Sequence, residues 1–444
     1  MRTVLSLIVI LLLTACSGPK YTVDDGRRVN EALLAQIRNY GAGERALRPA
    51  IERTAALKDP DCDKQWELPF SVATSYGWDE NDRVAWVRGL GVDERLTVVA
   101  VSTRSTLKVG DRITRIGSVA NDDSESLLEL LGYARDQGGS FEVTLADGKS
   151  RRIVAPFEVC RGYTRLAPPN TPALQDYHWL LTLHPLEVPA VGLDADEALW
   201  MVLWTQGLSE EGGARMKVYD YGMKFVGTLY NVATIATGLR GAAMAAETAI
   251  DAARSAAASA ATEVLKQQVI SEGQQYATDK IRQSMVDAGQ QVGKGQAVSA
   301  MQKASANRGN LWGVSRIAAT VFDRADAWAF ERMDKLGGQP LAGFTLHQKL
   351  VEAQAGSNAL LFDADRLVAL SHLAATRGMQ DQVTAILGGV DPDQLLAEIG
   401  SMPLASAHVA FSYSDPNDPA GLGSGPFARG LVDAMLRMPT ESKR

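Results

Sequence analysis

Residues Asp196 to Ser209 read DEALWMVLWTQGLS, a run that begins with acids and continues with almost unbroken apolar side chains. Asp194, Asp196 and Glu197 stand where a helix would begin, and the helix dipole favours negative charge at that end. Apolar residues follow at three- and four-residue spacings, the period of one helix face. They are Leu199, Val202, Leu203 and Leu208. The pattern predicts an amphipathic helix that packs into the core of the protein.

The N-terminus has the features of a bacterial lipoprotein signal. A positive charge precedes an apolar run at residues 4–13, which is too short to span a bilayer. The sequence Leu13-Thr-Ala-Cys16 resembles a lipobox, which implies removal of residues 1–15 and acylation of Cys16. Ser17, in place of an aspartate, resembles lipoproteins sent to the outer membrane, so the expected location is the periplasmic face of that membrane. The alternative is a plain secretory signal followed by an unmodified cysteine.

Length and composition set the broad class. The chain has 444 residues, which is room for two or three domains. Its 46% hydrophobic and 22% charged residues are typical of a globular protein, and a net charge of -7 argues against nucleic acid as a partner. The polar residues 16–27 are expected to form a tether from the membrane. Residues 28–83 are expected to form a helical N-terminal segment.

Three cysteines occur in the chain. If Cys16 carries lipid, Cys62 and Cys160 remain as an even pair in an oxidising compartment. We expect them to form a disulfide bond. The alternative is a pair of free, buried thiols.

A β-rich region follows the N-terminal helical segment. Residues 96–101 and 141–145 have the composition of short strands. Asp147-Gly148 predicts a hairpin turn before a further strand at 151–154. Residues 122–135 have the capping residues and leucine spacing of a helix.

The sequence Leu107-Lys-Val-Gly-Asp-Arg-Ile113, followed by Ile116-Gly117, resembles the L-x-x-G-D-x-I and I-N-G motifs of bacterial PDZ domains. The resemblance covers residues 84–157 and implies binding of an extended peptide by strand addition beside a helix, with a Gly-rich loop holding the terminal carboxylate. The implied carboxylate loop is Arg88, Gly89, Leu90, Gly91 and Val92, and the implied groove side chains are Leu127 and Leu131. The alternative is a domain of this shape that only packs on its neighbour.

Residues 158–444 are mainly helical in composition and include a long helical insertion at 218–296, part of it rich in alanine. Alanine allows close helix packing, although it also favours a free-standing helix. The predicted class is therefore α+β, with a small PDZ-like β domain followed by a mostly α-helical domain.

The helix at Asp196–Ser209 resembles the active-site helix of the CAAX-prenyl-endopeptidase and HtpX-type zinc metallopeptidases, which are gluzincins with the pattern D-E-L-A-x-V-L-A-H-E-x-x-H. In HExxH, two histidines bind zinc and the glutamate acts as general base. Those positions fall here on Thr205, Gln206 and Ser209. Residues 317–336 resemble the family helix E-x-E-A-D-x-x-G; Asp326 matches its Asp, and Phe322 stands at the third ligand position. The resemblance implies that the helices are retained while the zinc site is lost, so no metal, cofactor or catalytic residue is expected.

These features together predict a non-catalytic envelope lipoprotein, anchored to the outer membrane. Its expected role is to bind or scaffold periplasmic or outer-membrane proteins through the PDZ-like domain and the remnant cleft. One alternative is an active zinc metallopeptidase in envelope quality control, with ligands elsewhere in the chain. A second alternative is a structural lipoprotein whose alanine-rich helices mediate assembly.

Overall fold

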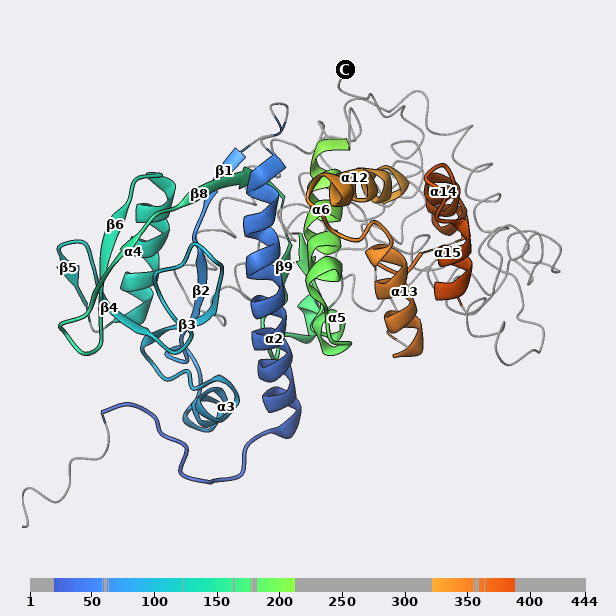
Figure 1. Ribbon diagram of the computed structural model, residues 1–444. Coiled ribbons are helices and arrows are strands. Elements are labelled where there is room, and N and C mark those ends of the chain that lie inside the picture. The colour runs from blue at the N-terminus through green and yellow to red at the C-terminus, as the bar shows by residue number, and fades with distance from the viewer. Residues whose placement is uncertain are drawn as a thin grey trace, which may run out of the picture.

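The computed structural model describes residues 20–57, 59, 62, 64–121, 123–162, 164–175, 177, 182–211, 322–353, 355, 359–362 and 364–387 (Figure 1). Helices and mainly antiparallel strands both occur there, which confirms the α+β class. Cys16 and the insertion at 218–296 lie outside the described residues.

The β-rich region forms one antiparallel sheet. Its order is β2-β3-β4-β6-β7, and β5 pairs with β4 beside that path. The strands are β2 (Phe70–Ala73), β3 (Leu96–Val101), β4 (Arg112–Ile116), β5 (Val119–Ala120), β6 (Phe141–Leu145) and β7 (Arg151–Val154). The predicted β6–β7 hairpin is present: Asp147 accepts from the backbone of Lys149 and Ser150, and Gly148 has a φ of +68° that favours glycine. Local turn chemistry therefore fixed this part of the sheet.

Two helices cover β3 from opposite faces. The helices are α4 (Ser124–Asp136) and α2 (Glu31–Thr54). Side chains alternate across a strand, so Leu96 and Val98 join the core beneath α4, whereas Val99 joins the core that contains α2. The apolar character of β3 follows from this burial on both faces.

Helix α2 begins at a side-chain cap, because Asn30 accepts from the backbone N–H groups of Ala32 and Leu33. Helix α3 (Glu80–Leu90) packs closely against it. A Cβ at Gly41 would lie 2.3 Å from a Leu90 methyl group, so the two helices approach through a glycine. Figure 1 shows α2 between the sheet and helix α6.

The predicted disulfide is confirmed. Strands β1 (Lys64–Glu67) and β8 (Phe157–Cys160) pair antiparallel, and Cys62 is bonded to Cys160 at the end of this ladder. The segment 28–83, expected to be helical, contains α2 and α3 but also β1 and β2. Because β2 belongs to the sheet, the sheet begins before residue 84.

Helix α6 (Ala195–Glu211) is the helix predicted from DEALWMVLWTQGLS. Asp194 accepts from the backbone of Asp196 and Glu197, and the Glu197 carboxylate accepts from Asp194 N–H, which is a capping box. The amphipathic pattern was wrong, because every residue from Glu197 to Leu208 is buried. A helix that is apolar all round is surrounded by protein.

Four described helices that follow α6 in the sequence pack on it or on its neighbours. They are α12 (Phe322–Lys335), α13 (Ala342–Glu352), α14 (Ala364–Ala375) and α15 (Gln380–Ile386). Shorter elements complete the described residues: η1 (Ala55–Leu57), β9 (Arg165–Leu166), η2 (Pro172–Leu174), β10 (Leu183–His184) and α5 (Glu187–Ala190). A Cβ at Gly207 would meet Trp328 at 2.8 Å, and one at Gly343 would meet Trp200 at 2.4 Å. Gly207 on α6 makes room for Trp328 of α12, and Gly343 on α13 makes room for Trp200 of α6, so both helices pack closely against α6.

Replacement of both bonded cysteines by serine, Cys62→Ser with Cys160→Ser, is expected to lower the free energy of unfolding by about 4 kcal/mol, because the bond constrains a long loop of the unfolded chain. The sequence separation is 98 residues. Urea unfolding of the paired variant and the parent measures the difference. An unchanged midpoint would mean that the bond does not contribute to stability.

Candidate functional site

The positions that the resemblance assigns to HExxH are all on α6. The Thr205 hydroxyl lies 2.9 Å from the Val202 carbonyl oxygen and 3.1 Å from the Thr164 hydroxyl. Gln206 donates from Nε2 to the Thr54 hydroxyl and the Cys160 carbonyl, both at 3.3 Å. These side chains are held by α2 and by the segment after β8, so they serve the packing of α6.

Ser209 completes the HExxH positions. Its side chain abuts Gly162, where a Cβ would lie 2.8 Å from Ser209 Cβ. Thr205 therefore shares with Ser209 a helix face turned toward residues 162–164. That face carries hydroxyl groups and no imidazole.

Phe322, at the third ligand position, contacts a different residue of α6. Its ring centroid lies 5.0 Å from that of Trp204 and 6.5 Å from that of Tyr177. His184 joins the same cluster, 4.7 Å from the Tyr177 ring. The structure thus brings α6 and α12 together through ring contacts and not through metal ligands. We call the four rings, Tyr177, His184, Trp204 and Phe322, the aromatic cluster.

A buried ion pair lies beside the aromatic cluster. Arg366 donates Nε to one Asp326 carboxylate oxygen and Nη2 to the other, both at 2.8 Å, and both side chains are 2% exposed. Nη1 donates to the carbonyl oxygens of Ala359 and Leu361. The guanidinium carbon lies 5.5 Å from the Trp204 ring and 5.1 Å from the Phe322 ring, within range of cation–π attraction. Sequence reasoning missed Arg366; a lone arginine in the apolar run 359–374 was the available signal.

The residues at this place do not fit a zinc ion. Zinc in proteins is bound by thiolate, imidazole or carboxylate groups. Thr205, Ser209 and Phe322 supply none of these, and the positive charge of Arg366 beside Phe322 opposes a divalent cation. In the part of the chain that the structure describes, no three His, Cys, Asp or Glu side chains are grouped to hold a metal ion.

Two histidines are buried: His184 in the aromatic cluster and His347 on α13. Burial lowers the pKa of His184 to about 3. Burial, with a smaller effect from the charge of Arg366, also lowers the pKa of His347 to about 3, and its Nδ1 accepts from the Phe362 backbone. The His184 nitrogens and the Tyr177 hydroxyl have no hydrogen-bond partner among the described residues. Both imidazoles are therefore neutral at pH 7.

The implied carboxylate loop, Arg88–Val92, lies at the end of α3. Arg88 pairs with Asp24 at 2.7 Å and donates to the Arg27 carbonyl oxygen. Gly89 and Leu90 pack on α2, and Gly91 ends α3 with a φ of +69°. Val92 is fully buried in the core that contains α2.

The implied groove side chains lie in the other core. Leu127 and Leu131 are buried beneath α4 together with Leu68 and Phe70. The structure therefore does not bring Leu127 and Leu131 together with the loop Arg88–Val92. What lies near α4 is instead the edge strand β2 and the turn before it.

Strand β2 ends the sheet, with β3 as its partner on one side. Helix α4 runs opposite to it: Ser124 at the start of α4 bonds the Glu94 carbonyl near the start of β3, and Gly138 after α4 abuts Trp66 just before β2. The turn before β2 is fixed by Arg48, which pairs with Glu67 at 2.9 Å and donates to the Leu68 carbonyl oxygen. Edge strand β2 thus runs antiparallel to α4, and Phe70 and Val72 pack into the core beneath that helix.

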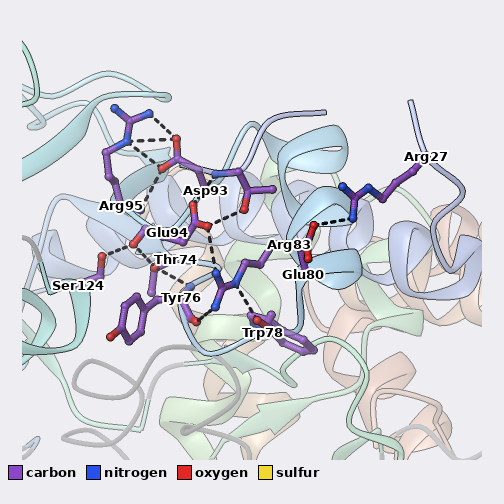
Figure 2. Close-up of polar contacts among 11 residues, drawn as sticks. Arg27, Thr74, Tyr76, Trp78, Glu80, Arg83, Asp93, Glu94, Arg95 and Ser124 are labelled. Atoms are coloured by element: carbon purple, nitrogen blue, oxygen red, sulfur yellow. Dashed lines mark hydrogen bonds and ion pairs between the residues drawn. The ribbon is translucent and has the colours of Figure 1, made fainter. Parts of the chain in front are cut away.

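A second polar network holds the N-terminal segment to the sheet domain (Figure 2). The Glu94 carboxylate accepts from the backbone and hydroxyl of Thr22 and pairs with Arg83 at 3.2 Å. Burial acts to raise the pKa of Glu94, but the Thr22 hydrogen bonds and the Arg83 charge outweigh it, so the pKa lies below its usual value. Arg83 also donates to the backbone of Tyr76 and Trp78.

Comparisons with protein-family models, curated proteins and solved structures find no match for this chain. Among the described residues, no helix is long and apolar enough to cross a membrane.

Asp326→Asn is expected to lower the free energy of unfolding by about 3–5 kcal/mol, because it leaves the Arg366 charge buried without its partner. The matched control is Asp334→Asn on the same helix, whose pair with Arg377 is exposed and worth less than about 1 kcal/mol. Chemical denaturation of the two variants gives both values. Equal losses of unfolding free energy in the two variants would contradict a larger contribution of the buried Arg366–Asp326 pair to stability.

His184→Phe is expected to make the protein less sensitive to acid. In the parent, the unfolded chain binds a proton below about pH 6.5 that the native His184 rejects, so stability falls as the pH drops. The variant should lose about 2 kcal/mol less than the parent between about pH 8 and about pH 5. Thermal or urea unfolding across this range measures the loss. A loss equal to that of the parent would contradict a neutral, buried His184.

Proposed function

We propose that this protein is a non-catalytic lipoprotein of the bacterial outer membrane, a pseudo-peptidase that binds or scaffolds other envelope proteins. One observation carries the proposal: Trp204, Phe322 and the Arg366–Asp326 pair fill the contact between α6 and α12. In a zinc peptidase of the type that the sequence resembles, this contact would hold the metal.

The chemistry of the aligned residues supports the absence of catalysis. A general base must be able to accept a proton near the working pH, and the amide of Gln206 does not. The Gln206 amide nitrogen donates to backbone and hydroxyl groups, and the side chain is fully buried.

A binding role rests on the sheet domain and its resemblance to PDZ domains. Strand β2 has a neighbour on one side only, and an edge strand offers unpaired backbone groups to an added strand. Helix α4 lies antiparallel beside it, and Val72, Leu130 and Ala134 are partly exposed on the margin of the core. We therefore place the peptide at β2 and α4 rather than at Arg88–Val92.

Two other functions remain as alternatives. An active peptidase would need ligands different from Thr205, Ser209 and Phe322. A structural lipoprotein would need contacts through the alanine-rich residues 218–296, which lie outside the described residues.

The metal content of the full-length protein, purified in detergent from an envelope fraction, tests the loss of the zinc site. We expect less than about a tenth of an equivalent of zinc after dialysis, since no aligned residue is a zinc ligand. Casein hydrolysis above that of a mock purification should be absent. One equivalent that resists dialysis, with peptidase activity, would support the active-enzyme alternative.

The proposed peptide site can be tested with two substitutions that each introduce a long charged side chain, at different places. Val72→Arg on β2 should weaken binding of a peptide library by at least about tenfold, because a charged side chain at the edge blocks an added strand. Gly91→Glu at the end of α3 should leave binding unchanged. Fluorescence anisotropy with peptides that have a free or an amidated C-terminus gives the affinities.

The two variants also distinguish the alternatives. Loss of binding in Gly91→Glu alone would return the site to Arg88–Val92, as the sequence suggested. Peptides that bind neither the parent nor the variants would reject a binding role for this domain and favour the structural lipoprotein.

A further inference from the structure

A pocket of about 310 Å³ lies where the N-terminal segment crosses the sheet domain. Its walls come from three parts of the chain: residues 20–24, the end of α3, and the strands that follow. The lining carries three cationic side chains, Lys20, Arg95 and Arg112, and two carboxylates, Asp24 and Asp93, together with Tyr21, Thr22, Val23 and Val87. Neither the peptide site nor the α6–α12 contact includes any of them.

The N-terminal wall is fixed to the domain. Thr22 is held through two hydrogen bonds to Glu94, at 2.9 and 2.6 Å. Asp24 is held by Arg88, whose guanidinium lowers the pKa of that carboxyl group to about 2. The segment from Thr22 onward is therefore part of the folded surface, although the sequence suggested a tether as far as residue 27.

The pocket carries more positive than negative charge. Arg95 and Arg112 both pair with the one carboxylate of Asp93, and Figure 2 shows the Arg95–Asp93 contact. Arg95 also stacks 4.2 Å from the centre of the Tyr21 ring, and Lys20 brings a further positive charge. Two guanidinium groups that share one carboxylate keep donors for a second anion. This excess stands out in a chain whose net charge is -7.

Chain length places this pocket close to the expected lipid anchor. Lys20 is four positions after Cys16, so it can lie at most about 14 Å from Cys16. Acyl chains on Cys16 would hold it at the boundary of the hydrocarbon, beneath a headgroup layer of about 5–8 Å on each side. Lys20 and Tyr21 then lie in or just above the headgroups, where aromatic and basic residues are favoured.

We propose that this face of the protein rests on the membrane and that the pocket binds the phosphate of an anionic phospholipid headgroup. The proposal rests on the lipid anchor of the proposed function. Val23, which is 51% exposed and lines the pocket, adds an apolar contact to the same face. Contact of this kind fixes the orientation of the whole domain, because the N-terminal wall is hydrogen-bonded to the sheet domain.

The lipidated full-length protein in vesicles provides the test. Acylation consumes Cys16, and Cys62 is bonded to Cys160, so a cysteine introduced at Val23→Cys is the one free thiol available for a fluorophore. Quenching by nitroxide on lipid headgroups is measured in vesicles of phosphatidylethanolamine with phosphatidylglycerol, and in phosphatidylcholine alone. The distant control label is Gln382→Cys, exposed on α15 at the opposite side of Figure 1.

We expect the label at residue 23 to be quenched at least about twofold more than the label at residue 382, with the difference largest in the anionic vesicles. Replacing Arg95 and Arg112 with glutamine should lower the quenching at residue 23 in anionic vesicles to the value measured in phosphatidylcholine vesicles. The matched control replaces Arg151 and Arg152 of strand β7 with glutamine. This variant has the same net charge as the Arg95 and Arg112 variant, and its quenching should equal that of the parent.

Two results would overturn the proposal, and they differ. Anchored protein with equal quenching at the two labels, or with no response to anionic lipid, would reject the membrane-facing pocket while leaving the lipid anchor and the scaffold role intact. Protein that does not partition into vesicles at all would reject the lipid anchor, and with it this surface.

Discussion

Burial of α6 on every side is the constraint on which the rest of this structure depends. Every residue from Glu197 to Leu208 is buried, so α6 cannot form part of a surface and must be enclosed by other elements. Helix α2 packs on one side, and α12 and α13 on others. The large side chains at these contacts require small residues opposite them: Gly343 on α13 faces Trp200 of α6, and Gly207 on α6 faces Trp328 of α12. Helix α6 thus joins α2 and the later helices into one core.

Charge inside this core is stabilised by hydrogen bonds and by the aromatic rings packed around it. The Arg366–Asp326 pair is bidentate, and the remaining guanidinium donors reach backbone carbonyls, so the desolvation of both ions is offset by hydrogen bonds. Aromatic rings surround the same guanidinium. A metal ion would need anionic or imidazole donors at this place. The one carboxylate here, that of Asp326, is already paired with Arg366, and His184 is the one imidazole of the aromatic cluster.

The sheet domain has two distinctive margins. Its edge strand β2 has a single partner strand, and Arg48 from α2 donates to the Ser71 hydroxyl and to the Leu68 carbonyl oxygen. Its N-terminal border is closed by residues 20–27, which pair with α3 and with Glu94. The two margins meet at Glu94: its carbonyl oxygen accepts from Thr74, which follows β2, and its carboxylate accepts from Thr22.

Local chemistry was sufficient to predict several elements of this protein. The helix at Asp196–Ser209 followed from its acidic start and apolar spacing, the β6–β7 hairpin from Asp147-Gly148, and the disulfide from an even pair of cysteines. Each depends on residues close in sequence or on the redox compartment. The α+β class followed from the same local patterns.

Tertiary contacts decided the rest, because they join residues that no short-range pattern relates. The sequence placed Thr205 and Phe322 at one site, yet it is Trp204 that contacts Phe322, since neighbouring helical residues point about 100° apart. The carboxylate loop predicted at Arg88–Val92 is the end of a helix packed on α2, and the sheet edge is β2, which the sequence had assigned to a helical segment. The sequence by itself determined helix α6, helix α4 and the β6–β7 hairpin, as these depend on neighbours a few residues away. Only the tertiary structure decided which side chains meet, because Arg366 finds Asp326 and Arg48 finds Glu67 through packing across 40 and 19 positions of chain.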